Sequence, residues 1–380
     1  MTLQKRSKIR LGIVFTFPIA NSRANFLTHI PIRIKRLLGH NAEVFVLYSG
    51  ALNEDVLRRE GINCFSMMSL RNRRIAKIFL PVILFCYTGV FLYRYKLDVV
   101  MNANNHKWMF PVALAARLIG KKSVARIAGD IMLGRTKGVK GKLALIHNKI
   151  VEKVSLLTVD KIVCLSDSLK EITIKRTGFD KKVRVISQGV DTDRFIMADR
   201  SKISENSQIR LIFIGRIEIN KGLHYALQAF CRLKERGFNL CFDIYGDGSQ
   251  RAFLENRCKN IEGIHFHGYI YHDDIPGALM EGGILVLPSI YEGFGHVVLE
   301  AMASGVPVTA TAVGDLPKFM DNGNNGILVP VRDIEAISAA ILRYINEPEL
   351  RTECIVNARK YVNKEHSYRV LREKHLALLS

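Results

Sequence analysis

Two glutamates, Glu292 and Glu300, stand eight residues apart in the stretch Tyr-Glu-Gly-Phe-Gly-His-Val-Val-Leu-Glu at 291–300. An apolar run at 284–287 predicts a buried strand before the first glutamate, and a helical pattern from 295 to 304 contains the second. One carboxylate then lies at the end of a strand, and the other lies about two turns inside the following helix. Ionised glutamate accepts hydrogen bonds from neighbouring hydroxyls, so the pair predicts a polyhydroxylated ligand such as a sugar.

The loop that carries Glu292 is rich in glycine. Gly293 and Gly295 flank Phe294, and glycine lets a backbone approach a ligand closely. Two glutamates at this spacing are nevertheless common in ordinary strand–loop–helix units. The spacing alone therefore does not define a site, and the whole string has to be considered.

A second stretch, Gly-Arg-Ile-Glu-Ile-Asn-Lys-Gly at 215–222, combines two cations with the start of a helix. A strand is predicted at 210–215 and a helix at 223–236. Free N–H groups at a helix N-terminus, the guanidinium of Arg216 and the ammonium of Lys221 together make an anion site. A diphosphate leaving group needs such a site, because its negative charge grows as its bond to a sugar breaks.

These two stretches resemble the donor-site motifs of the retaining glycosyltransferases with the GT-B fold, the large family-4 class (glycosyl transferases group 1). The resemblance covers nearly all of the second half of the chain. It implies that Glu292 lies beside the transferred sugar and that Glu300 holds the nucleotide ribose. Glu292, Arg216 and Lys221 are the expected catalytic residues. The expected donor-binding residues are Glu300, Gly215, Gly293, Phe294, Gly295 and Gly246, the last in a Gly-Asp-Gly turn similar to one in the family.

In the first half of the chain, Arg-Ile-Ala-Gly-Asp at 126–130 follows a predicted strand and is similar to an R-x-x-G-D pattern of some family members. The resemblance makes Asp130 and Arg126 candidates for binding the acceptor or the sugar. The alternative for Asp130 is a loop cap, a common use of aspartate. Ala128 stands near the place where many relatives carry a histidine, and the loop at 18–23 lacks the glycine pair that the family usually shows.

The elements that must position these residues are short apolar runs that alternate with helical stretches. The predicted strands lie at 8–17, 43–48, 99–101, 123–127, 161–165, 210–215, 239–245, 265–269, 284–287 and 325–330, and a further strand is expected to start at 306–308. Such alternation builds βαβ units with right-handed crossovers and parallel sheets. The predicted fold is α/β, with two doubly wound Rossmann-like domains facing across a cleft (GT-B). The predicted domains are an acceptor-binding domain at 1–190, a nucleotide-sugar-binding domain at 191–365 and a C-terminal helix at 366–380 that crosses back to the first domain.

Charge is distributed unevenly along the chain, whose formal net charge is +21. Residues 1–200 contain 36 Lys+Arg and 14 Asp+Glu, whereas residues 201–380 contain 20 and 21. The basic half is therefore expected to face an anionic partner, such as a membrane surface or a lipid-phosphate substrate. Nucleic acid is not expected, because the basic residues are not interleaved with aromatic residues and no nucleic-acid-binding motif is visible.

The segment Ile-Phe-Leu-Pro-Val-Ile-Leu-Phe-Cys-Tyr-Thr-Gly-Val-Phe-Leu-Tyr at 78–93 has no charged residue. It is too short to span a hydrocarbon core of about 30 Å comfortably, and Pro81 and Gly89 are expected to interrupt it. A buried helix is the favoured interpretation, and a transmembrane span is the least favoured. The remaining alternative is a helix in the membrane interface whose basic flank contacts anionic headgroups, through Arg71, Arg73, Arg74 and Lys77.

The rest of the composition indicates which cellular compartment and which cofactors to expect. The seven cysteines are scattered without a Cys-x-x-Cys pair, which argues against a disulfide framework and indicates a reducing compartment. No apolar run of a secretory signal follows the charged N-terminus. No Asp-x-Asp motif or cluster of metal ligands is visible, so we expect no metal and no cofactor besides the donor substrate. The expected location is cytoplasmic, peripheral at the cytoplasmic face of the membrane.

The residues and the resemblance together predict a retaining glycosyltransferase. Its donor is expected to be a nucleotide-diphosphate sugar, and its acceptor a lipid-linked or cell-envelope glycan. A sugar-nucleotide epimerase of the same fold is one alternative, and it would need acid and base residues at the sugar ring. A non-catalytic basic membrane-binding module is another, and it would not need Glu292, Arg216 and Lys221 together.

Overall fold

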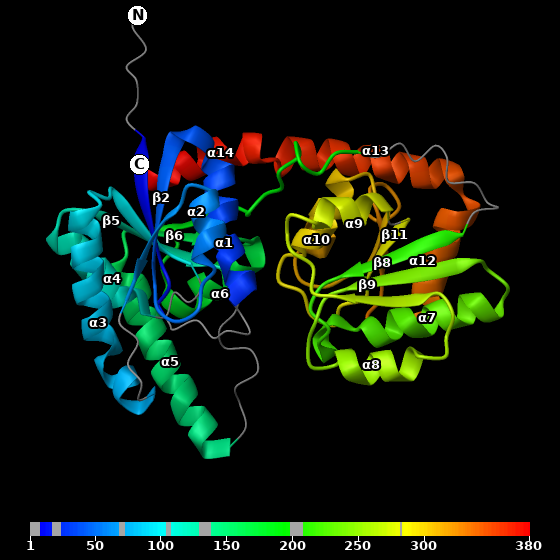
Figure 1. The fold of residues 1–380 in the computed structure, drawn as a ribbon, viewed down its shortest axis with the longest axis horizontal. Coiled ribbons are helices and arrows are strands. Elements are labelled where there is room, and N and C mark those ends of the chain that lie inside the picture. The colour runs from blue at the N-terminus through cyan, green and yellow to red at the C-terminus, as the bar shows by residue number, and fades with distance from the viewer. Residues whose placement is uncertain are drawn as a thin grey trace, which may run out of the picture. The chain divides into compact units, whose positions relative to one another are not determined.

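The protein is described by a computed structural model that covers the backbone of residues 8–16, 24–67, 73–103, 108–128, 138–197, 208–281 and 283–380. Side chains are described for the same residues except 24–26, 73–78 and 138–145. The chain forms two compact units (Figure 1). Unit 1 runs to Gln188 and includes Leu371–Ser380, and unit 2 is Gly189–Val370. The sequence-based division was at 190/191 and 365/366.

Unit 1 is built on a seven-stranded sheet with the strand order β3-β2-β1-β4-β5-β6-β7. Every pairing in it is parallel. Its strands are β1 (Ile9–Val14), β2 (Ala42–Tyr48), β3 (Asn63–Ser66), β4 (Val99–Asn102), β5 (Lys122–Ile127), β6 (Lys161–Cys164) and β7 (Val183–Val185). The strand order reverses between β1 and β4, so the sheet is doubly wound.

The helices of unit 1 lie on both faces of this sheet. They are α1 (Ala24–Leu38), α2 (Glu54–Arg59), α3 (Arg73–Arg94), α4 (Met109–Leu118), α5 (Gly138–Thr158) and α6 (Asp167–Thr177), with a short 3₁₀ helix η2 (Gly39–Asn41). Strands β1, β2 and β3 follow one another toward one edge of the sheet. Strands β4, β5 and β6 follow one another toward the opposite edge. Right-handed crossovers then place α1 and α2 on one face and α3, α4 and α5 on the other. One hydrophobic cluster accordingly contains Phe91 of α3, Val112 of α4 and Leu156 of α5.

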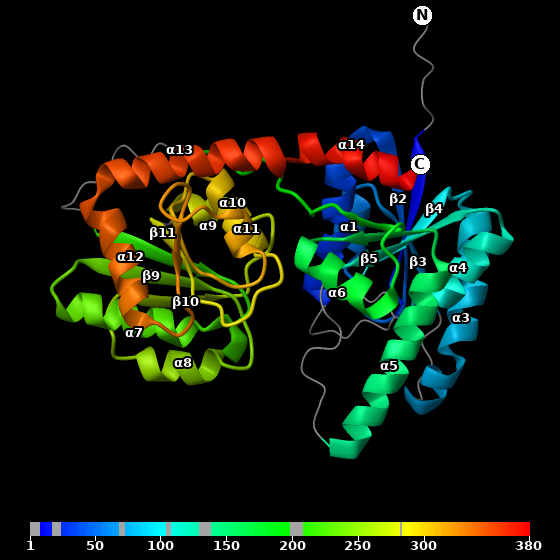
Figure 2. The same cartoon turned by 180° about the vertical axis from the view of Figure 1, so that it is seen from behind.

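Unit 2 repeats this architecture with a six-stranded parallel sheet in the order β10-β9-β8-β11-β12-β13. The strands are β8 (Ile209–Ile214), β9 (Leu240–Tyr245), β10 (Ile264–Gly268), β11 (Ile284–Leu287), β12 (Val308–Thr311) and β13 (Ile327–Val329). The helices are η4 (Ile219–Lys221), α7 (Leu223–Glu235), α8 (Arg251–Cys258), α9 (Ile275–Glu281), α10 (His296–Ala303), α11 (Leu316–Phe319), α12 (Ile334–Asn346) and α13 (Pro348–Glu365). Figures 1 and 2 show α7 and α8 on one side of the sheet and α9 and α10 on the other. The predicted α/β class with two doubly wound sheets is thus confirmed.

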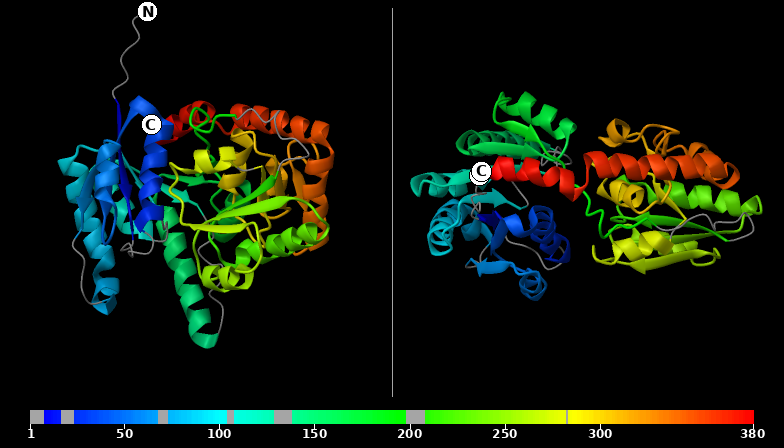
Figure 3. Two further views of the ribbon diagram at one scale, coloured as in Figure 1. Left: turned by 45° about the vertical axis from the view of Figure 1, so that its right-hand side comes forward. Right: turned by 90° about the horizontal axis from the view of Figure 1, so that it is seen from above.

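The last helix, α14 (Tyr368–Leu379), ends in unit 1, and Figure 3 gives two further views of its course. Lysines hold its C-terminal carbonyls: Lys161 donates to the carbonyl of Leu378 at 2.7 Å, and Lys122 donates to that of Ser380. Arg372 donates from the helix to the Leu37 carbonyl at 2.8 Å. Cations at a helix C-terminus are favoured by the helix dipole, so these contacts stabilise the return of the chain to unit 1.

The structure corrects two expectations about the uncharged segment at 78–93. It lies inside the single 22-residue helix α3, which continues through Pro81 and Gly89. A Cβ on Gly89 would lie 4.0 Å from Ile119 Cδ1, an ordinary van der Waals distance, so α3 lies close to the end of α4 at this point. The helix is not simply buried either, because one stripe of it is exposed, including Tyr93. No helix among the described residues is long and apolar enough to span a membrane.

A histidine on α14 should make the stability of the fold depend on pH. Burial lowers the pKa of His375 from 6.5 to about 4, and the nearby Arg126 acts in the same direction. Between pH 6.5 and about pH 4, His375 is protonated in the unfolded chain but neutral in the folded chain. The folded state therefore loses up to about 3 kcal/mol through this group across that window, and the loss is absent at neutral pH. The substitution His375→Gln should flatten the unfolding free energy measured by urea titration between pH 6.5 and 4; parallel curves for the two proteins would contradict this.

Candidate active site

The loops that follow β8 and β11 meet at the centre of the unit 2 sheet. These two strands are neighbours, and the strand order reverses between them. Ligands of open α/β sheets bind outside the carboxyl ends of the strands at such a reversal. Lys221 lies in the loop after β8 and Glu292 in the loop after β11. The topology therefore brings together two residues that lie far apart in the sequence.

The two loops are joined through their backbones. The N–H groups of Ile290 and Tyr291 both donate to the carbonyl of Asn220, at 2.9 and 3.3 Å. Gly222 adopts φ +64°, and a Cβ there would lie 2.0 Å from the carbonyl oxygen of Pro288. Only glycine fits both this conformation and this contact. The close approach of the backbones fixes the end of η4 against the end of β11.

Lys221 and Glu292 form an ion pair in this corner. The Lys221 Nζ to Glu292 Oε2 distance is 2.5 Å, and the exposed fractions of the two side chains are only 15% and 13%. Ser289 donates to Glu292 Oε2 at 3.4 Å, and the N–H of Gly293 donates to Oε1 at 3.2 Å. The carboxylate thus accepts hydrogen bonds from one cation and two further donors, and charge-assisted hydrogen bonds are the stronger ones.

Two helix N-termini open at the same edge of the sheet. Helix α7 begins after Gly222 and α10 after Gly295, and neither helix receives a side-chain cap. Gly295 adopts φ +79°, and a Cβ there would lie 3.6 Å from Glu292 Cγ. Uncapped N–H groups carry partial positive charge and bind anions. The site therefore combines two sources of helix-dipole charge with the ammonium of Lys221.

Arg216 is the second cation of the predicted anion site, and its side chain is exposed. It lies near Glu218, whose pKa is held below its usual range mainly by a hydrogen bond from Ser249 and in part by Arg216. His224, in the first turn of α7, has a pKa lowered by burial, so it adds no positive charge near neutral pH. Arg216 and Lys221 are accordingly the cations that this loop offers to an anion.

Gly215 and Gly246, both predicted to bind the donor, have a clear structural role. A Cβ on Gly246 would lie 1.8 Å from the carbonyl oxygen of Gly215. The N–H of Gly215 donates to the Tyr245 carbonyl at 3.0 Å, and that of Gly246 donates to the Gly268 carbonyl at 2.6 Å. These contacts tie the loops after β8, β9 and β10 together at one edge. Their donor-binding role stays a prediction.

Glu300 lies in the middle of α10 and is 3% exposed. Its Oε1 atom is 3.2 Å from Nε2 of His272, in the loop between β10 and α9. His272 was not among the sequence candidates, and only the tertiary fold places it beside Glu300. A lone polar histidine in a loop carries no sequence signal for this role. The pairing orients the Glu300 carboxylate, whose assignment to the ribose stays a prediction.

Phe294 and Gly293 lie side by side in the sequence but in different surroundings. The ring of Phe294 contacts Phe319 and His366, with centroid distances of 5.5 and 5.8 Å. It therefore packs within an aromatic cluster of unit 2, which favours a structural role for its side chain. A Cβ on Gly293, in contrast, would meet no protein atom within 4 Å. The open space beside Glu292 lies at Gly293.

Arg126, a candidate for the acceptor or sugar, ends up inside unit 1 on β5. It is 5% exposed. Its guanidinium donates to the Ala103 carbonyl at 3.3 Å and to Gln188 Oε1 at 3.1 Å. Burial, with a smaller effect of Arg33, lowers its pKa to about 10. These bonds join β5 to Ala103, which follows β4, and to Gln188, which follows β7. Asp130 and the loop at 18–23 lie outside the described residues.

Comparisons with known proteins identify the family of this chain. Residues 34–194 match the family model described as Glycosyltransferase Family 4, and residues 196–361 match the one described as Glycosyl transferases group 1. The chain belongs to the group 1 glycosyltransferases. It is 31% identical over 222 residues to an uncharacterized glycosyltransferase of Methanocaldococcus jannaschii, which covers 55% of this chain and 56% of that protein. The chain spans about half the length of the first curated relatives it matches.

A second relative is LpsE of Rhizobium meliloti, a lipopolysaccharide core biosynthesis glycosyltransferase, which is 28% identical over 58% of this chain and 64% of its own. Among solved structures, Anabaena HepE in complex with UDP and glucose has a TM-score of 0.76 at 15% identity, covering 98% of this chain and 99% of that one. At this identity the likeness shows the fold alone, and the fold is that of the GT-B glycosyltransferases.

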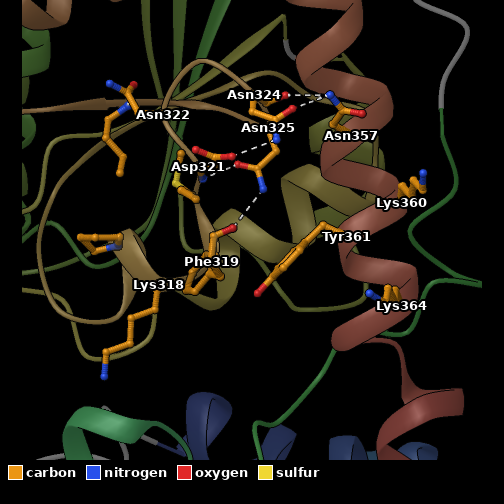
Figure 4. Close-up of a pocket in the computed structure, with 13 residues that line it drawn as sticks. Lys318, Phe319, Asp321, Asn322, Asn324, Asn325, Asn357, Lys360, Tyr361 and Lys364 are labelled. Atoms are coloured by element: carbon orange, nitrogen blue, oxygen red, sulfur yellow. Dashed lines mark hydrogen bonds between the residues drawn. The ribbon is translucent and has the colours of Figure 1, made fainter.

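This glycosyltransferase also has a groove of 760 Å³ in unit 2, formed by α11, the turns before β13 and α13 (Figure 4). Its wall carries amides, but they bond to neighbouring protein groups. Asn357 donates to Asn324, Asn324 donates to Asp321, and Asn325 donates to the Phe319 carbonyl. None of the predicted site residues lines it. Within the described part of the chain, no three His, Cys, Asp or Glu residues are grouped to hold a metal ion.

The glycines around Glu292 allow a test of the site's construction. Gly314 adopts φ +60°, and a Cβ there would lie 2.1 Å from the carbonyl oxygen of Glu292. We expect Gly314→Ala to lower the free energy of unfolding by at least about 3 kcal/mol, because backbone must shift to admit the methyl group. The matched variant Gly293→Ala, whose methyl group points into open space, should cost less than about 1 kcal/mol. Chemical denaturation measures both, and equal losses would show that the loop is not held as described.

Proposed function

We propose that this glycosyltransferase transfers a sugar from a nucleotide-diphosphate sugar to a lipid-linked or cell-envelope glycan acceptor and retains the anomeric configuration. The observation that carries the proposal is the ion pair of Lys221 and Glu292 at the strand reversal of unit 2. In this pair, a cation that can bind a diphosphate lies next to a carboxylate that can accept hydrogen bonds from sugar hydroxyls. The two uncapped helix N-termini beside it supply further positive charge.

The chemistry follows from this placement. The bond between the anomeric carbon and the diphosphate oxygen breaks, and a bond from that carbon to the acceptor oxygen forms on the same face. The acceptor proton passes to the leaving phosphate oxygen, so the step balances without a separate base. Arg216, Lys221 and the helix N-termini stabilise the charge that develops on the diphosphate. Glu292 accepts hydrogen bonds from the sugar, and Glu300 from the ribose.

The relatives support the choice of substrates. HepE was crystallised with UDP and glucose, which suits a nucleotide-sugar donor here. LpsE builds lipopolysaccharide core, and another relative, CapM of Staphylococcus aureus, builds capsular polysaccharide. Both names favour a cell-envelope acceptor. We further propose that the enzyme works without a metal ion and lies at the cytoplasmic face of the membrane.

The diphosphate assignment is tested by replacing the two cations. Arg216→Ala removes an exposed side chain and should leave folding intact while weakening nucleoside diphosphate binding, because a charge-assisted bond is worth about 1.5–3 kcal/mol. Arg216→Ala combined with Lys221→Ala should abolish transfer. Calorimetry with UDP and GDP measures the affinity, and Lys259→Ala, an exposed cation on another loop of unit 2, serves as the control. Unchanged diphosphate affinity in the double variant would remove Arg216 and Lys221 from the donor site.

The reaction itself is tested by its product. We expect a glycoside of unchanged anomeric configuration, detected by NMR after incubation with a panel of nucleotide sugars and glycan acceptors. Gly293→Ala should raise the KM for the donor, because its methyl group occupies the open space beside Glu292. An epimerised nucleotide in place of a glycoside would overturn the transferase assignment in favour of an epimerase.

Independence of metal is a separate prediction. Positive charge for the leaving group is already present in Arg216, Lys221 and the helix N-termini, so chelation should not reduce the rate. The measurement is transfer activity after exhaustive treatment with EDTA, compared with untreated enzyme. Activity that disappears and returns with Mg²⁺ or Mn²⁺ would show this prediction to be wrong.

A further inference from the structure

Helix α3 presents a stripe of apolar side chains to the outside of unit 1. Phe79, Val82, Cys86, Val90 and Tyr93 are all exposed, and successive members are three or four residues apart. That spacing places them along one side of a helix. Tyr93 is 82% exposed. The opposite side of the helix packs into the core of unit 1.

The next two helices repeat this arrangement. On α4, Leu114 and Leu118 are four residues apart and exposed, and Leu118 is 70% exposed. On α5, exposed apolar side chains recur at intervals of three or four residues, at Ile146, Ile150, Val154 and Leu157. Each helix therefore has an inner face in the core and an outer apolar stripe.

The three stripes form one continuous surface, because the helices are neighbours on the same face of the sheet. Ile119, at the end of α4, reaches to 4.0 Å from the Cβ position of Gly89 on α3. The N–H of Phe110 on α4 donates to Ser155 Oγ on α5 at 3.2 Å. Figures 1 and 2 show α3, α4 and α5 side by side. We call the outer surface of α3, α4 and α5 the docking face.

The docking face is unusual within this molecule. Of the 21 large apolar residues that are exposed among the described side chains, 11 lie on α3, α5, α4 or the residue after α4. Helices α1 and α2, on the other face of the same sheet, contribute none of them. Single exposed apolar residues are ordinary, whereas a contiguous patch marks an interaction surface.

Charge indicates what covers this surface. The sequences of α3, α4 and α5 contain nine Lys+Arg and a single acidic residue, Glu152. Glu152 is buried, and its Oε2 atom lies 3.8 Å from Nη1 of Arg176. The exposed charges among the described side chains of these helices are therefore positive, as at Arg94, Arg117 and Lys149. A second copy of the chain would bring like charges together across a symmetric contact, whereas an anionic surface would neutralise them.

We propose that the docking face binds the surface of an anionic lipid bilayer. The apolar stripes enter the boundary between headgroups and acyl chains, and the lysines and arginines beside them reach the lipid phosphates. This inference deepens the proposed function, on which it rests for the membrane-bound acceptor, and it names the surface. The sequence pointed to the basic first half of the chain and to the segment at 78–93, and the structure adds the outer faces of α4 and α5. The flanking Arg71, Arg73, Arg74 and Lys77 lie outside the described side chains.

The first test separates apolar insertion from charge. Leu118→Gln with Ile150→Gln changes two exposed side chains, so folding should be retained and can be checked by circular dichroism. Sedimentation with vesicles of mixed phosphatidylcholine and phosphatidylglycerol should show at least about tenfold weaker partitioning than for the unmodified protein. The matched control is Phe253→Gln with Val356→Gln, two exposed apolar residues of unit 2, and it should partition normally.

The second test addresses charge. Binding should rise with phosphatidylglycerol content and weaken with added salt, because salt screens the headgroups. Lys149→Glu with Lys153→Glu should remove most of this salt dependence, whereas Lys259→Glu should preserve it. Normal vesicle binding by both the apolar pair and the charge pair would overturn the proposal.

Other outcomes also test whether the docking face binds lipid. If light scattering shows a dimer that Leu118→Gln with Ile150→Gln converts to a monomer, while vesicle binding is unchanged, the face binds a second copy and the lipid proposal fails. Capture by an acidic protein with no affinity for vesicles would likewise overturn it. Nucleotide-sugar binding measured on the same variants should be unaffected. A protein that docks on vesicles but binds no nucleotide sugar would refute the proposed transfer and leave the docking face standing.

Discussion

The backbone around Asn220 and Gly222 lies directly against the backbone that leaves β11, and the candidate active site is arranged around this contact. The carbonyl of Asn220 accepts two N–H groups from the β11 loop, and Gly222 leaves no room for a side chain beside Pro288. A backbone pairing of this kind cannot be adjusted by rotating side chains. It therefore sets the distance between Lys221 and Glu292 before any ligand enters, which is the pre-organisation that an electrostatic site requires.

The Lys221–Glu292 pair has an energetic cost for folding. Partial removal of both charges from water is costly, and a well-packed apolar pair would serve stability at least as well. A partly buried ion pair at the carboxyl ends of the central strands is therefore the position at which a ligand site is expected in this fold. The neighbouring glycines agree with this view. Gly314 and Gly295 are crowded by protein atoms, whereas Gly293 faces open space, so the loop is rigid on one side and accessible on the other.

The two units use the same winding for different purposes. In unit 2 the reversal between β8 and β11 gathers the charged groups of the site. In unit 1 the reversal between β1 and β4 distributes the helices over two faces of different chemistry. Among the described side chains, α1 and α2 expose no large apolar residue, whereas α3, α4 and α5 each expose a stripe of apolar residues. The excess of positive charge in the first half of the chain is thus combined with apolar surface, a combination that would suit the lipid docking proposed above.

Local sequence patterns determined most of the elements, and they supplied the candidate residues of the site. Apolar runs between polar helical stretches predict parallel strands whether or not distant partners are known, and the strings around Arg216 and Glu292 define the family. The strands β3 (Asn-Cys-Phe-Ser) and β7 (Val-Arg-Val) were missed, because runs this short that contain polar residues show too little apolar periodicity. Tertiary packing alone decided that α3 continues through Pro81, that Phe294 joins an aromatic cluster and that His272 meets Glu300. These outcomes depend on contacts between residues far apart in the chain, and neither spacing nor composition encodes which buried face a side chain will meet.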